Sequence, residues 1–253
     1  MTSEYSVMLE DKTDKFNELD SMFVSLISSL TYREWRIPSM IEGEILRRCG
    51  YFSTIPNQLS KVSVIDRDSL SHELNDEKYN FDSSSDLYLT PAACIHLYPI
   101  LGDLKLKNEI VTTLARVYRY EDGNFEKNNR QWEFSVREFV AVGTQEYVDN
   151  FLEQMQEKLL KYARTIDNCA NIELANDHFY PTKINLKKEK YQKQNNLKKE
   201  LIIEVKGEKI SVASFNKHGN HFSKEFNFDQ NGEIVTGCVG CGIDRWLELC
   251  KNK

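Results

Sequence analysis

The chain has 253 residues, 40% of them hydrophobic and 11% aromatic, which is enough for one large domain with a buried core. Its net charge of −6 does not favour general nucleic-acid binding. No run of about 18 apolar residues is present, so we expect no membrane span, and the acidic start does not resemble a targeting signal. Six unevenly spaced cysteines favour free thiols in a reducing cytoplasm over a disulfide scaffold.

Hydrophobic spacing predicts a helix over residues 12–30, capped by Thr13 or Asp14, and a second helix over 41–49 that Gly50 ends. Three further segments complete this half of the chain. We predict strands interrupted by Pro56 at 50–65, a polar surface excursion at 66–86, and a buried turn and strand at 87–101.

Residues 114–143 alternate apolar and polar positions on either side of a polar loop, which predicts two antiparallel strands. A long amphipathic helix follows at 144–167. The later predicted elements are a strand and turn at 171–180, strands at 201–205 and 209–216, and a strand entering a helix at 232–251. The predicted fold class is therefore α+β, an antiparallel sheet with helices packed on it.

The predicted hairpin carries charges at its centre: Arg119, Glu121, Arg130 and Glu138. Charges on a sheet face are costly unless a partner neutralises them. A nucleotide phosphate, a metal or an amino acid would serve.

The glycine-rich stretch near the end contains Cys238 and Cys241 in a CxxC arrangement, with Arg245 in the following helix. Taken alone, the pair is compatible with part of a zinc site, a redox pair or two buried thiols, although no second CxxC completes a zinc ribbon. His96 lies in an apolar run and is predicted to be a core residue. His218 and His221 are expected in a loop after a strand.

Residues 183–199 carry seven lysines and one glutamate and show no hydrophobic face. We expect a solvated, partly mobile connection. A docking patch for an acidic partner is the alternative.

Three stretches in order, GYFSTIP, RVYRYE with RQWEFSVRE, and GCVGCGIDR, resemble the three motifs of the class II aminoacyl-tRNA synthetase core. LTPAACIHLYP, VREFVAVG, LANDHF, SFNKHGNHF and TGCVGCGIDR resemble the amino acid:carrier-protein ligases, which are similar to atypical seryl-tRNA synthetases. The resemblance covers about residues 35–250. It implies a single class II synthetase-like catalytic domain over 1–253, without a tRNA-binding domain.

The resemblance implies a zinc ion held by Cys94, Glu138 and Cys238, with a fourth position for the substrate's amino group. Only the first cysteine of the CxxC would then bind metal.

The resemblance also implies an ATP site, with ATP carrying Mg²⁺. Arg119, Glu121 and Arg245 are the expected catalytic residues, and Arg130 and Phe134 complete the nucleotide contacts. Arg119 is expected to bind the α-phosphate, Glu121 the adenine amino group and Arg130 the outer phosphates. Phe134 is expected beneath adenine, with Arg245 on its opposite face.

Asn176, Asp177, Asn216 and His218 match polar positions of the family's substrate pocket. Two departures stand out. His178 replaces a usual proline, and no acidic residue before the third motif aligns with the Mg²⁺ ligand, for which Glu204 and Glu208 are candidates.

The implied function is ATP-dependent activation of a small amino acid as its adenylate and transfer to the phosphopantetheine thiol of an acyl or peptidyl carrier protein. The expected assembly is a homodimer built on the first motif, and tRNA is not the expected acceptor. The alternatives are aminoacylation of tRNA with a borrowed binding subunit, a non-catalytic amino acid or adenylate sensor, and a zinc-stabilised structural protein.

Overall fold

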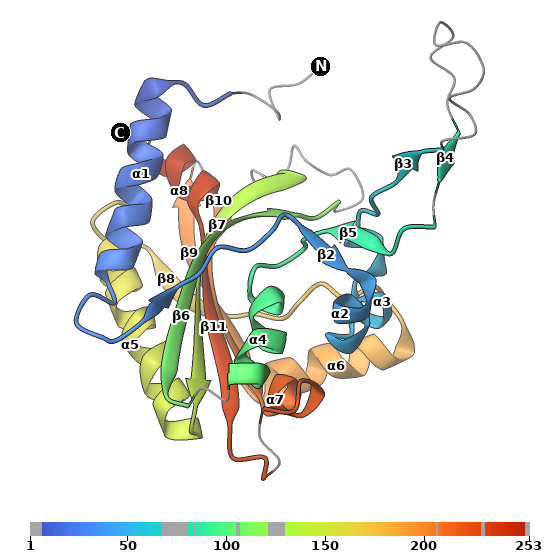
Figure 1. Ribbon diagram of the computed structural model, residues 1–253. Coiled ribbons are helices and arrows are strands. Elements are labelled where there is room, and N and C mark those ends of the chain that lie inside the picture. The colour runs from blue at the N-terminus through green and yellow to red at the C-terminus, as the bar shows by residue number, and fades with distance from the viewer. Residues whose placement is uncertain are drawn as a thin grey trace, which may run out of the picture.

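The computed structural model describes residues 7–66, 80–82, 84–104, 107–120, 130–205, 207–228 and 231–250. Its centre is a seven-stranded sheet in the order β1-β6-β7-β11-β10-β9-β8 (Figure 1). Neighbouring strands are antiparallel except β1 and β6, which are parallel. The expected α+β class is confirmed, with a parallel strand at one edge. The strands are β1 (Arg33–Glu34), β6 (Glu109–Tyr118), β7 (Glu133–Gly143), β8 (Asn171–Leu174), β9 (Lys198–Val205), β10 (Glu208–Gly219) and β11 (Val235–Gly242).

One face of the sheet is covered by α1 (Glu10–Ser25), α5 (Gln145–Ala163) and α8 (Ile243–Cys250) (Figure 1). Alternate residues of β7, including Phe139 and Ala141, join these helices in the larger hydrophobic core. The helices predicted at 12–30 and 144–167 are thus confirmed. The predicted caps Thr13 and Asp14 are wrong, because α1 begins after Leu9, which makes no side-chain cap bond.

The other face is covered in part by η4 (Cys94–His96), α4 (Leu97–Leu104) and α7 (His221–Glu225) (Figure 1). The prediction of a turn and strand at 87–101 is therefore wrong after β5 (Leu87–Leu89). Pro99 does not prevent a helix here, because it lies in the first turn of α4, where its missing N–H is not needed.

The segment 50–65, predicted as strands, contains α3 (Tyr51–Thr54), η2 (Pro56–Gln58) and only a short β3 (Val64–Ile65). Gly50 has a φ of 78°, which reverses the chain after α2 (Gly43–Arg48) and starts the next helical turn. Two small sheets lie beside the main one. They pair β2 (Met40–Glu42) with β5 and β3 with β4 (Phe81–Asp82) (Figure 1). Most of the predicted excursion at 66–86, residues 67–79 and 83, lies outside the described residues.

The lysine-rich segment is not the expected irregular connection, because it forms the helix α6 (Lys183–Gln194). Thr182 caps the helix by accepting a hydrogen bond from the backbone N–H of Asn185. The buried Asn185 amide also donates to the carbonyls of Ser53 and Tyr180. Polar tethers, rather than a hydrophobic face, therefore hold α6 on the protein.

No helix within the described ranges is long and apolar enough to cross a membrane.

Candidate active site

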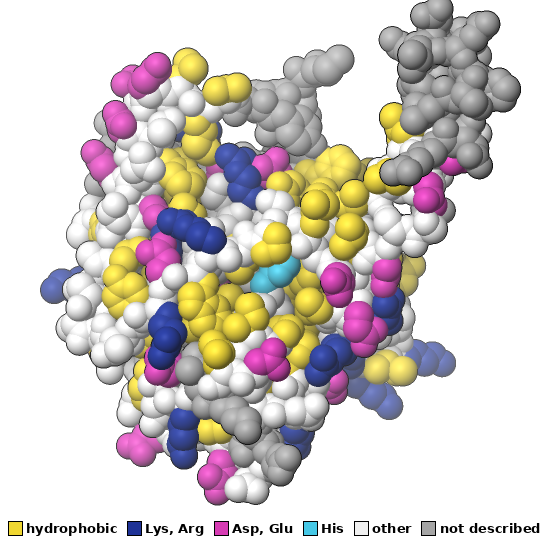
Figure 2. Space-filling model, viewed as in Figure 1, with side chains coloured by type: hydrophobic (Ala, Val, Ile, Leu, Met, Phe, Trp, Pro, Cys, Tyr) yellow, Lys and Arg dark blue, Asp and Glu magenta, His cyan; other side chains and the backbone are white. Residues whose placement is uncertain are grey.

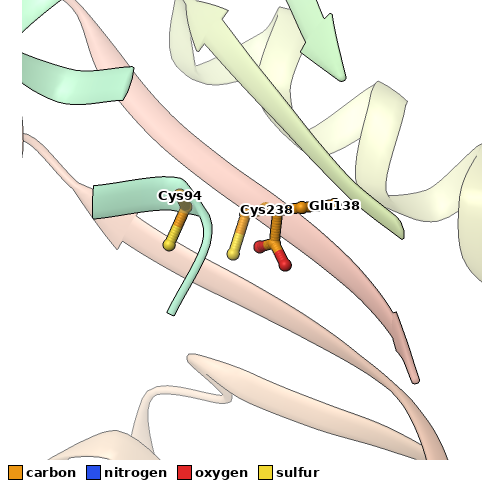
Figure 3. Close-up of side chains that lie close together, drawn as sticks. All are labelled: Cys94, Glu138 and Cys238. Atoms are coloured by element: carbon orange, nitrogen blue, oxygen red, sulfur yellow. The ribbon is translucent and has the colours of Figure 1, made fainter. Parts of the chain in front are cut away.

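Three potential metal ligands meet on the sheet face opposite α1, α5 and α8. Cys94 comes from η4, Glu138 from β7 and Cys238 from β11 (Figure 3). Their ligand atoms all lie within 4.8 Å of one another, and all three residues are buried. Residues far apart in the chain thus form one cluster of two thiols and one carboxylate.

Strand register explains why these residues meet. Lys198, Asn216 and Cys238 form one row across β9, β10 and β11. The next row on the same face runs through Glu200, Ser214, Gly240, Glu138 and Thr113. A Cβ on Gly240 would come within 2.9 Å of a carboxylate oxygen of Glu138, so this glycine makes room for the carboxylate.

The electrostatics of this cluster favour a bound cation. Burial raises the pKa of Glu138 to about 7, although a hydrogen bond with Cys238 and the charge of Arg119 act in the opposite direction. A hydrogen bond with Cys94, together with burial, raises the pKa of Cys238. A divalent cation would reverse these shifts by supplying positive charge to the deprotonated ligands.

The donor set fits zinc, which binds thiolates and carboxylates in tetrahedral sites and keeps a fourth position open where it is catalytic. The side chain of Thr113 also supports a bound ligand at this point. Thr113, which lies opposite Glu138 in register, has a buried hydroxyl without a hydrogen-bond partner among the described residues. An orphaned buried hydroxyl at this point is expected where a polar ligand is missing.

The expected nucleotide residues Arg119 and Phe134 lie next to each other. Arg119 follows β6, and its guanidinium carbon is 5.6 Å from the centre of the Phe134 ring on β7. The Arg119 side chain also donates to the carbonyl of Pro91 at 2.8 Å. Its positive charge acts to lower the pKa of Glu138, against the larger effect of burial, and it also helps to lower the pKa of Asp177. Arg119 therefore interacts electrostatically with both carboxyl groups.

Arg245 lies on α8, where its guanidinium donates to the carbonyl of Ser211 at 2.7 Å. The preceding residue, Asp244, accepts a hydrogen bond from the backbone of Ser135, the neighbour of Phe134, at 2.5 Å. The start of α8 is thereby fixed at the end of β7 that carries Phe134. Arg130 comes three residues before β7, and Glu121 lies outside the described residues.

Two of the four expected substrate residues adjoin the metal ligands. The Asn216 amide is 3.5 Å from the sulfur of Cys238, and so is Nε2 of His218. The prediction of a loop at His218 is wrong, because this residue belongs to β10, and His221 begins α7. His96 is buried and bonded to Thr90 at 2.8 Å, as a core histidine should be.

Asp177 is already bound by other side chains. One carboxylate oxygen pairs with Lys198 at 2.7 Å, and the other accepts from Gln192 of α6 at 2.7 Å. Asn176 donates to the carbonyl of Asp177 at 3.2 Å. Asp177 therefore ties α6 to β9, at the edge of the row that contains Asn216 and Cys238.

Neither acidic residue suggested for Mg²⁺ suits that task. Glu204 and Glu208 are both exposed at the far ends of β9 and β10. Glu200 instead lies in the row of Gly240 and Glu138, where it pairs with Lys198 at 3.2 Å.

The sequence interpretation missed Lys198, Glu200 and Gln192. A signal for the first two was present, since they alternate along a strand whose other positions, Leu201 and Ile203, are buried. Gln192 has no comparable signal, because its role depends on where α6 packs.

The sheet and its covering helices match a class II synthetase fold. A solved structure of M. kandleri SerRS in complex with A. aeolicus tRNASec superimposes with a TM-score of 0.74. The match covers 93% of this chain and 51% of that chain at 22% identity, so it identifies the fold. No protein-family model matches the chain.

Similarity in sequence identifies the family, whereas the structural match identifies only the fold. Amino acid–[acyl-carrier-protein] ligase 1 of Bradyrhizobium diazoefficiens is 32% identical over 226 residues, which cover 83% of this chain and 68% of that protein. Ligase 2 of the same organism is 31% identical and is covered to 66%. The type-2 serine–tRNA ligase of Methanocaldococcus jannaschii is 26% identical, and the chain spans 50% of its length. The chain therefore belongs to the amino acid–[acyl-carrier-protein] ligase family.

Proposed function

We propose that this protein activates a small amino acid with ATP, as an aminoacyl-adenylate, and transfers it to the phosphopantetheine thiol of a carrier protein. The observation that carries the proposal is the buried Cys94–Glu138–Cys238 cluster beside the Arg119–Phe134 pair. Family membership at 32% identity supports the same reaction.

Cys94, Glu138 and Cys238 would hold zinc, which supplies a Lewis-acid site for the amino group of the substrate. The substrate's carboxylate needs no general base, because it is already a nucleophile. One carboxylate oxygen attacks the α-phosphorus of ATP, the bond to the β-phosphate breaks, and pyrophosphate leaves. Arg119 stabilises the charge on the α-phosphate during this step.

Phe134 would stack on the adenine ring, with Arg245 on the other side and Arg130 at the outer phosphates. In this arrangement the Arg119 guanidinium leaves the Phe134 ring when adenine binds. The contact of Glu121 with the adenine amino group stays a prediction, because this residue lies outside the described part of the chain. We further propose that Glu200 is the acidic residue that faces the Mg²⁺ bound to ATP.

We propose that the carrier protein docks on α6. Lys187 and Lys188 are exposed there beside Ile184 and Tyr191, two residues that are 69% and 62% exposed. Figure 2 shows dark-blue side chains beside hydrophobic ones at the lower right, where Figure 1 places α6. Basic and apolar side chains together suit an acidic protein with a phosphodiester-linked arm.

A shallow hollow lies on this helix. It has a volume of about 520 Å³ and is lined by Phe179, Ile184, Lys187, Lys188, Tyr191 and Gln192. Gln192 binds Asp177, which binds Lys198 in the row of Asn216 and Cys238. A pantetheine arm entering over α6 would therefore approach the adenylate from this side.

We also propose that residues 1–253 act as one class II synthetase-like catalytic domain and that two copies form a homodimer through the segment around α3. That segment contacts α6, since the carbonyl of Ser53 accepts from Asn185. Analytical ultracentrifugation tests the dimer.

The acceptor is tested by incubating zinc-loaded protein with ATP, Mg²⁺ and labelled small amino acids. A phosphopantetheinylated carrier protein and total tRNA are offered in parallel. We expect label on the carrier protein as a thioester, and none on carrier protein that lacks the pantetheine arm. Label on tRNA alone would support the tRNA-dependent alternative. Binding of amino acid and ATP without any transfer would support the sensor.

A further inference from the structure

We propose that His218 is a positioning residue for the metal ligand Cys238, with its Nε2–H donating a hydrogen bond to the sulfur. This inference rests on the proposed zinc site. His218 would then hold a zinc ligand in place, whereas the family resemblance implied that it contacts the amino-acid substrate.

The backbone around His218 directs its side chain to Cys238. The pairing of β10 with β11 shifts between Lys217, which pairs with Gly237, and Gly219, which pairs with Thr236. His218 is therefore the extra residue of a β-bulge, a feature that changes the direction of a side chain. Nε2 of His218 lies 3.5 Å from the sulfur of Cys238.

The other ring nitrogen is held by two hydroxyl groups. Nδ1 of His218 is 3.0 Å from the Thr236 hydroxyl and 3.3 Å from the Tyr98 hydroxyl. A hydroxyl can donate, so both groups can supply the hydrogen bond that an unprotonated Nδ1 accepts. That tautomer leaves the proton on Nε2, which faces the sulfur.

A metal-bound thiolate accepts hydrogen bonds and donates none, which fixes the direction of the contact. The Asn216 amide supplies a second donor to the same sulfur at 3.5 Å. Two donors from β10 therefore point at Cys238. They would orient its sulfur and reduce its negative charge, which leaves the metal a stronger Lewis acid towards the substrate's amino group.

Aromatic packing keeps the imidazole in this position. The Phe222 ring meets it edge to face with 5.0 Å between centroids, and Phe222 itself stacks on Tyr98 at 3.8 Å. His221, three residues further on, is exposed at the start of α7 and offers a matched control.

The test measures zinc affinity by competition with a chromophoric chelator in His218→Leu, His218→Gln and His221→Leu. We expect His218→Leu to weaken zinc binding by roughly 10- to 100-fold, the usual effect of losing an outer-shell partner. His218→Gln should keep most of the affinity, because its amide can donate to the sulfur, and His221→Leu should match the wild type.

Cobalt(II) substitution gives a readout independent of activity. His218→Leu should shift the thiolate-to-cobalt absorption band, whereas His221→Leu should not. Wild-type zinc affinity and an unshifted band in His218→Leu, with a raised KM for the amino acid, would show a substrate contact and overturn the inference. If His218→Leu does not fold, the double variant Thr236→Val with Tyr98→Phe replaces it, because this variant removes both hydroxyl groups that contact Nδ1 of His218. The double variant should bind zinc more weakly than the wild type. Unchanged zinc affinity in the double variant would overturn the proposed role of His218.

Variants of Cys238 and His218 separate the role of His218 from the proposed zinc site. Zinc lost in Cys238→Ser but retained at full affinity in His218→Leu refutes only the role of His218. Zinc retained in Cys238→Ser refutes the metal site itself.

Discussion

Arg137 and Glu138 are neighbours in β7 and point to opposite faces of the central sheet. Glu138 joins the two cysteines of the candidate metal site, whereas Arg137 is 2% exposed and pairs with Asp20 of α1 at 2.6 Å and Glu34 of β1 at 3.0 Å. Because side chains alternate along a strand, β7 places Glu138 in the metal site on one face of the sheet. On the other face it places Arg137 where it anchors α1.

Replacing Arg137 should destabilise the fold much more than replacing an exposed arginine. Arg137→Met leaves Asp20 and Glu34 without their shared cation, and we expect a loss of about 3 kcal/mol in the free energy of unfolding. Arg116→Met, which breaks the exposed pair with Glu133, should cost about 1 kcal/mol or less. Urea denaturation measures both, and equal losses would show that the Arg137 pairs do not anchor α1.

The metal site is tested by a cysteine series. Cys94→Ser should lose zinc, since it removes one of three protein ligands. Cys241→Ser and Cys169→Ser should keep it, because Cys241 is buried in the core on the opposite face and Cys169 is exposed. Metal analysis of purified protein gives the stoichiometry. One zinc per chain in Cys94→Ser would refute the site.

Much of the fold is predictable from alternation and helical spacing, which identified β6, β7, β9, β10, β11 and α5. The helix α6 was missed because polar tethers through Asn185 and Gln192 hold it, and these leave no hydrophobic stripe in the sequence. The helix α4 was missed because a proline such as Pro99 usually argues against a helix. Pro99 is compatible with α4 only because it lies in the first turn of the helix, which the sequence does not reveal.

The candidate site also contains residues that the sequence predicted and contacts that it did not. The resemblance to synthetase motifs predicted Cys94, Glu138 and Cys238 as metal ligands. In the folded chain these three side chains lie close together. The contact between His218 and Cys238 and the ion pair between Asp177 and Lys198 depend on the packing of segments that are distant in the sequence. No local pattern indicates either one.

Charge reversal on α6 tests carrier docking. Lys187→Glu with Lys188→Glu should raise the KM for the carrier protein roughly 10-fold and weaken its salt dependence, while adenylate formation stays unchanged. The matched control is Lys15→Glu with Lys161→Glu, which makes the same charge change on the helices α1 and α5 of the opposite face. Equal KM values in the two double variants would exclude α6 as the docking surface.

The Asp177–Lys198 pair should make stability depend on pH. Burial pushes the pKa of Asp177 upward, but the Lys198 ammonium and the Gln192 amide more than offset it and hold the pKa below its usual value. A carboxyl group with a lowered pKa stabilises the fold at pH values above its unfolded pKa and loses this contribution as the pH falls through the folded pKa.

The difference in unfolding free energy between wild type and Asp177→Asn should therefore be fully present near neutral pH. It should be lost as the pH falls below the ordinary pKa of an aspartate and through the lowered folded-state pKa of Asp177. The Asp177 side chain is 41% exposed, so added salt should also reduce the difference. A difference that stays constant across this pH range would mean that the ion pair does not contribute.

Amino-acid-dependent exchange between ATP and labelled pyrophosphate measures the formation of an aminoacyl-adenylate directly. Zinc-loaded protein should catalyse exchange with at least one small amino acid, and Arg119→Ala should lower the rate by roughly 100-fold or more without reducing zinc content. No exchange above background with any small amino acid, in fully zinc-loaded and folded protein, would show that the chain does not form an aminoacyl-adenylate.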